Sequence, residues 1–182
     1  GDAGDLSITS GKTAASGSGG QVTITSGSST PTSSGDIIMT TADAGTAGVS
    51  GMIHLSTGAS TDGRSGAVMI TTGPGVQDAS GDILLAVGSG NTGAGGDVVV
   101  TAGETTADDA AGGKVTVTSG TGDLSGDVTM KSGTATNGVS GAMTFASGGS
   151  KGVSGALSIK SGDASAANSG SVTVESGAST GS

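Results

Sequence analysis

An eight-residue pattern that occurs twelve times constrains this chain more than any other feature. In its most regular form it reads Gly-x-apolar-x-apolar-x-Ser-Gly, as in GDVTMKSG at 126–133. The third and fifth positions are apolar in every copy. Alternation with period two is typical of a strand with one buried face, and a disordered low-complexity chain has no reason to keep it. The pattern therefore predicts an ordered, all-β chain. The copies begin at Gly4, Gly20, Gly35, Gly51, Gly66, Gly81, Gly96, Gly113, Gly126, Gly141, Gly155 and Gly170.

The regular recurrence of one strand and one loop favours a solenoid over a propeller, because a propeller blade needs about four strands in roughly 40 residues. Single steps between first glycines range from 13 to 17 residues, but alternate copies counted from Gly4 lie 29 to 31 residues apart. We therefore predict a parallel β-solenoid (β-helix) of about 12 repeats of about 15 residues, with two repeats per coil and six coils. A coil of one repeat is the alternative.

The predicted fold assigns a role to each position of a copy. The aliphatic side chains at the third and fifth positions should meet in the middle of the solenoid. The seventh position should lie toward the turn and hydrogen-bond along the stack; in the first copies it is Ser10, Ser26, Thr41 and Thr57.

The two ends of the chain bear on its organisation. The first copy, GDLSITSG, and the last, GSVTVESG, are as regular as those in the middle. A free solenoid should end in atypical, polar repeats, because an uncovered coil exposes an open β edge. We therefore expect residues 1–182 to be a single continuous solenoid array and a fragment of a longer array, or a rod whose ends stack on other copies.

Catalytic chemistry has little support in the sequence. His54 is the only histidine, lies between Ile53 and Leu55, and is predicted to point outward. The chain has no cysteine and no second histidine with which to build a relay. Gly-Ser strings such as ASGSGG at 15–20 follow no strand-to-helix context, so they indicate loops rather than a phosphate cradle. We predict that the chain is not an enzyme and has no obligatory cofactor.

Calcium is the one metal considered. Asp97 and Asp127 occupy the second position of their copies and would be neighbours in a ladder of alternate copies. A Ca²⁺ ion takes six to eight oxygen ligands, and one carboxylate per copy supplies few of them. Asp97 and Asp127 are therefore weak candidates for loosely bound Ca²⁺, and a solvated acidic rim is the simpler interpretation.

Threonine columns raise the possibility of ice binding. Thr9, Thr40, Thr71 and Thr101 would stack on one face. In the last two odd-numbered copies the same position is lysine, and Lys131 and Lys160 end the threonine column. Threonine is also simply a good strand residue. The column therefore supports an ice-binding function only weakly.

Charge excludes several partners. The formal net charge of −9 disfavours nucleic acid and anionic lipid, because their binders carry basic patches. No apolar run approaches the 18 or so residues of a membrane helix, so membrane insertion is not expected. Asn91, Asn137 and Asn168 lack the N-glycosylation sequon, whereas O-glycosylation of loop serines and threonines and binding of a glycan stay open.

Over the whole chain, the Gly-x-apolar-x-apolar-x-Ser-Gly copies resemble the Gly/Ser/Thr-rich β-solenoid repeat shafts of extracellular filaments and surface adhesins. The resemblance implies a structural protein outside the cell or on its surface, a shaft that acts as a mechanical spacer. It also implies self-association, end to end or lateral, into fibres. An adhesive or ice-binding module is the alternative function.

Overall fold

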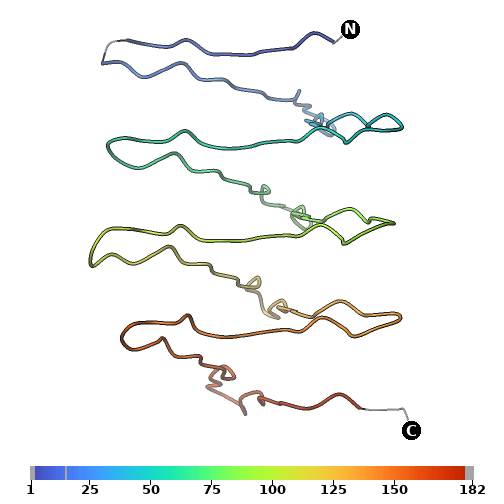
Figure 1. Ribbon diagram of the computed structural model, residues 1–182, viewed down its shortest axis with the longest axis vertical. Coiled ribbons are helices and arrows are strands. Elements are labelled where there is room, and N and C mark those ends of the chain that lie inside the picture. Colours follow the sequence, from blue (N-terminus) through green and yellow to red (C-terminus); the bar gives the residue numbers. More distant parts are fainter. Residues whose placement is uncertain (1–2, 15, 179–182) are drawn as a thin grey trace. The chain divides into compact units, whose positions relative to one another are not determined.

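The computed structural model describes residues 3–14 and 16–178, and this part of the chain contains no helix and no β-strand. Figure 1 accordingly draws no coiled ribbon and no arrow; the copies are extended runs joined by loops. The predicted all-β solenoid is therefore wrong, with either two repeats or one repeat per coil. A β-strand requires a hydrogen-bonded ladder to a neighbouring strand, and the extended runs in the described residues have none.

The absence of a core gives the physical reason. No described residue is buried, and the predicted inward pair of the ninth copy, Val128 and Met130, is 53% and 64% exposed. Aromatic side chains supply much of an ordinary core, and this chain has one phenylalanine. Its 39 glycines lose more conformational freedom on ordering than any other residue. Alternation decides which side chains share a face, but it does not provide a layer to cover that face.

The chain divides into two units, Gly1–Ala86 and Val87–Ser182. The boundary falls inside the sixth copy, GDILLAVG at 81–88, rather than in a loop. Each unit consists of extended runs separated by short loops. A single continuous array over 1–182 stays a prediction.

Bends and turns are confined to the loops between copies, as at 30–32, 61–63 and 122–124. Three of the described residues have a left-handed backbone, and all three are in loops: Gly63 (φ 107°), Gly93 (φ 77°) and Asp109 (φ 57°). Glycine adopts this conformation without steric cost, and aspartate is one of the few other residues that tolerates it. The residues with special backbone conformations therefore lie in the loops and not in the extended runs.

Side chains also fix the loops locally. In the loop 28–34, the Thr32 N–H donates to Ser29 Oγ (3.2 Å), and the two hydroxyl oxygens lie 2.9 Å apart. In the loop 74–80, the Ala79 N–H donates to Asp78 Oδ1 (2.8 Å). A methyl group on Gly75 would overlap the carbonyl oxygen of Asp78, so this turn needs glycine at its start. Short polar side chains that bond nearby backbone groups are typical of turns.

Candidate functional site

The most repeated local structure is the closure of most of the loops, which we call the neck. A neck consists of the opening glycine of one copy and the seventh and eighth residues of the copy before it. In four necks the N–H of the opening glycine donates to the carbonyl of the eighth residue. These bonds join Gly20 to Gly11 (2.9 Å), Gly35 to Gly27 (2.9 Å), Gly113 to Gly103 (2.8 Å) and Gly126 to Gly120 (3.1 Å).

Close packing explains the glycine at the first position of some copies, such as those that open at Gly20 and Gly96. A Cβ atom on Gly20 would lie 3.1 Å from the nitrogen of Gly11 and 3.2 Å from Cβ of Ser10. A Cβ on Gly96 would lie 3.0 Å from Cγ1 of Val87. Only a residue without a side chain avoids such contacts. In nine of the eleven loops of the described residues, a Cβ atom added to the opening glycine would lie within 4 Å of the preceding seventh residue: Ser10–Gly20, Ser26–Gly35, Thr41–Gly51, Thr57–Gly66, Thr72–Gly81, Val87–Gly96, Ala102–Gly113, Ser119–Gly126 and Ser132–Gly141.

The seventh position is the best covered part of six of the copies. All half-buried residues in the described part of the chain occupy it: Ser10, Ser26, Ala102, Ser119, Ser132 and Ser161. Ser10 Oγ donates to the carbonyl of Gly20 (2.9 Å) and so bonds across its own neck. The predicted hydrogen bonding of the seventh residue along a stack of coils is wrong, because residues 3–14 and 16–178 form no sheet or solenoid.

The necks also accommodate unequal loops. The residues between successive copies range from 121–125, the shortest loop, to 104–112, the longest. Both loops end in a neck of the same kind. The Gly126 N–H donates to the carbonyl of Gly120 (3.1 Å), and the Gly113 N–H donates to the carbonyl of Gly103 (2.8 Å). A long spacing between two first glycines, followed by a short one, therefore reflects only the lengths of the two loops. It does not require a coil of two repeats.

The residues considered for chemistry are not part of the necks, although Asp97 and Asp127 directly follow the neck residues Gly96 and Gly126. His54 is exposed on its run. Asp97 and Asp127 are exposed, and the described residues contain no group of three or more His, Cys, Asp or Glu side chains that would hold a metal ion. Loose binding of Ca²⁺ at Asp97 and Asp127 stays a prediction. No pocket occurs in residues 3–14 and 16–178, and this part offers no apolar helix of membrane-spanning length.

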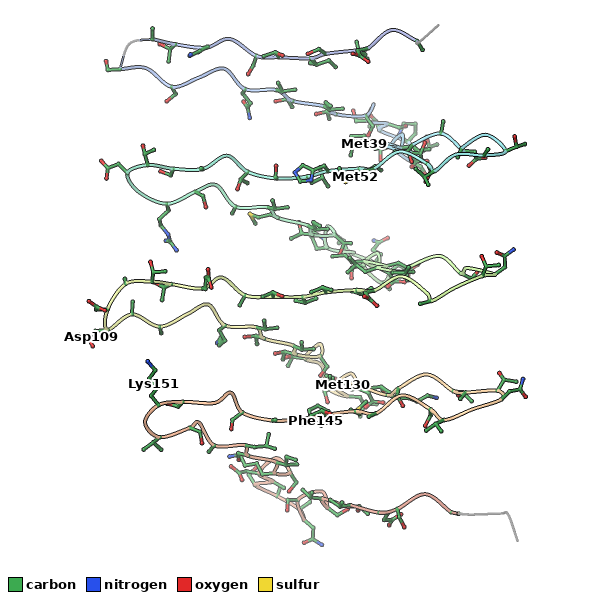
Figure 2. All side chains as sticks on the ribbon, in the orientation of Figure 1. Met39, Met52, Asp109, Met130, Phe145 and Lys151 are labelled. Atoms are coloured by element: carbon green, nitrogen blue, oxygen red, sulfur yellow. The ribbon has the colours of Figure 1, made fainter. Side chains whose placement is uncertain are left out.

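The apolar runs are the other candidate surface. From the second copy to the eleventh, third-position side chains are 44–64% exposed and fifth-position side chains 55–77%. Where the fourth position is also apolar, as at Ile38 and Val99, it is 78–87% exposed. Figure 2 shows Met130 and Phe145 on extended runs, and Asp109 and Lys151 on loops. In the four runs with three consecutive apolar residues, the predicted inward side chains thus share the less exposed face, although no described residue covers that face.

Sequence reasoning missed the necks. The signal was present, since every copy opens with glycine and most close with a small residue and glycine. The pattern alone indicates that these glycines bound each extended run, and it does not indicate that they approach one another across a loop. No family, no curated protein and no solved structure matches the chain.

Proposed function

We propose that this chain is a structural protein, a repetitive shaft segment of an extracellular filament or cell-surface fibre that acts as a mechanical spacer. The observation that carries the proposal is the repetition of one uncovered apolar pair in all twelve copies. A catalytic site needs one particular set of residues, present once. A shaft needs the same structural unit repeated many times. The extracellular setting rests on the resemblance to filament and adhesin shafts.

The local structure supports a spacer. Each copy is an extended run, and a residue in an extended run advances the chain by about 3.3 Å. Loops of different length close with the same backbone hydrogen bond, as the loops that end at Gly113 and Gly126 do. A repeated local unit that tolerates unequal loops suits a spacer.

The exposed apolar side chains require a partner in water. Monomeric proteins rarely expose contiguous apolar patches of more than a few hundred Å², and here the large apolar side chains of the described residues are all at least 44% exposed. Self-association into fibres satisfies this requirement without a second component.

Electron microscopy and sedimentation of the purified chain test the proposal. We expect thin fibres to form as the concentration is raised in solutions of physiological salt. Dispersed monomers at every concentration would contradict it. Thermal-hysteresis and glycan-binding assays on the same material test the adhesive or ice-binding alternative, and clear activity in either would replace the proposed function.

A further inference from the structure

The chain exposes far more surface than a folded protein of its size. Its accessible surface is 17983 Å² for a mass of 16.5 kDa. A folded monomer of that mass exposes roughly 7,600 Å² by the usual scaling of surface with mass. The excess is several times the 1,200–2,000 Å² or so that a stable protein–protein interface buries. The uncovered surface is therefore large enough for each chain to be covered by more than one neighbour.

The backbone of the runs is equally uncovered. The four backbone–backbone hydrogen bonds between described residues all lie at necks. Folded proteins make roughly one internal hydrogen bond per residue. An extended segment whose amide and carbonyl groups lack intrachain partners is a template for pairing with another extended segment. The runs thus combine an apolar face with a backbone edge that can pair.

The repeat itself restricts which partner fits. A partner that covers all twelve copies must present apolar pairs at the same spacing of 13 to 17 residues, and a second copy of this chain does so. Small residues at the seventh, eighth and first positions leave room for close approach between chains. The net charge of −9 opposes an acidic partner, including a second copy, but this repulsion is spread over 182 residues and is screened by salt. Nucleic acid and anionic lipid carry the same charge sign and also lack the spacing.

We propose that the extended runs pair in trans with the runs of a second copy of this chain, and that the third- and fifth-position side chains form the face buried by pairing. This inference rests on the proposed function and names the interface through which fibres form. The β-structure arises between chains and is absent from the isolated chain.

Four copies allow a matched test, because their third, fourth and fifth positions are all apolar. One variant replaces the fifth positions, M39S/I70S/L85S/V100S. The control replaces the neighbouring fourth positions, I38S/M69S/L84S/V99S. Each variant removes one Met, one Ile, one Leu and one Val, so the two have the same composition, net charge and mean hydropathy. They differ only in the face of the run that becomes polar.

Sedimentation gives the concentration at which assembly begins, and infrared spectroscopy gives the β-content. We expect the fifth-position variant to raise that concentration by more than about tenfold, since each substitution removes a buried aliphatic side chain. The fourth-position control should stay within about twofold of the parent. The β-signal of the parent should appear only together with assembly.

The outcomes separate this inference from the proposed function. If the parent assembles and the two variants behave alike, the interface is wrong and the fibre function stands. A β-signal in dilute monomers, independent of concentration, would also overturn pairing in trans. If the parent does not assemble under any condition, both proposals fail.

Discussion

The necks and the runs are made from the same few residue types, yet they differ in how much of their structure is completed within one chain. At a neck, the Gly113 N–H donates to the carbonyl of Gly103, and the glycine lies against Ala102. In the middle of a run such as 97–101, the three valines are 64–80% exposed, and none of the described backbone–backbone hydrogen bonds involves these residues. The difference shows that closing a short loop needs only near neighbours in sequence, whereas covering a run needs a second layer.

The entropy of chain closure explains the contrast. Bringing the ends of a short loop together costs little entropy, and a close-packed glycine and one hydrogen bond offset part of that cost. Aligning two extended runs orders many more residues, and its stabilisation comes mainly from apolar burial. With short aliphatic side chains and abundant glycine, that burial is not achieved within one chain.

Hydrogen exchange should show the largest effect. In dilute monomer, we expect the neck amides of Gly20, Gly35, Gly113 and Gly126 to exchange about fivefold more slowly than unprotected amides, since one net hydrogen bond contributes about 1 kcal/mol. Amides in the middle of runs, such as that of Ile24, should be unprotected. After assembly these mid-run amides should slow by about 100-fold or more, because paired strands open rarely. Protected mid-run amides in the dilute monomer would remove the distinction between necks and runs.

Salt and pH should change assembly by several-fold while leaving the necks unaffected. Raising the ionic strength from 0.01 M to 0.15 M shortens the Debye length from about 30 Å to about 8 Å and so weakens repulsion between chains of net charge −9. Lowering the pH toward the sequence pI of about 4.1 brings the net charge toward zero and acts in the same direction. Sedimentation across both series measures the onset of assembly. An onset that does not change with salt would show that charge repulsion does not limit pairing.

Substitution at one neck gives a smaller and more local effect. In Gly113→Ala the new methyl group would lie 3.1 Å from the nitrogen of Gly103, so the neck must open or shift. We expect loss of protection at the residue 113 amide, equivalent to about 1 kcal/mol, measured by hydrogen exchange.

Gly103→Ala is the matched control in the same neck, because no atom lies within 4 Å of the added methyl group. It should leave the residue 113 amide protected, or increase that protection slightly through reduced freedom of the open chain. Equal loss of protection in both variants would mean that close packing does not define the neck.

The hydroxyl at the seventh position should contribute least. Ser10→Ala removes the 2.9 Å hydrogen bond to the carbonyl of Gly20 at a site that is only half-buried. A cost of about 0.5 kcal/mol is expected, seen as roughly twofold faster exchange at the Gly20 amide. Ser7→Ala, at the exposed fourth position of the same run, provides the baseline. Indistinguishable rates in the two variants would show that the hydroxyl does not stabilise the neck.

The sequence alone determined the repeat, its boundaries and the two faces of each run. Alternation is a property of neighbouring residues, so Val98 and Val100 were predicted to share a face opposite to Val99, and their lower exposure agrees with that. The location of bends between copies also followed from glycine, proline and small polar residues, whose backbone preferences act within a few positions.

Only the tertiary structure decided whether the runs pair and where the chain closes on itself. Pairing depends on whether the free energy gained by burying side chains such as Val128 and Met130 exceeds the conformational entropy lost when a glycine-rich chain is ordered. A local sequence pattern does not show the balance between these two large and opposing contributions. The necks depend on the distance between residues such as Ser10 and Gly20, which belong to different copies. Side-chain periodicity is fixed by the covalent order of residues, whereas contact requires that the chain gain more from closing than it loses in conformational entropy.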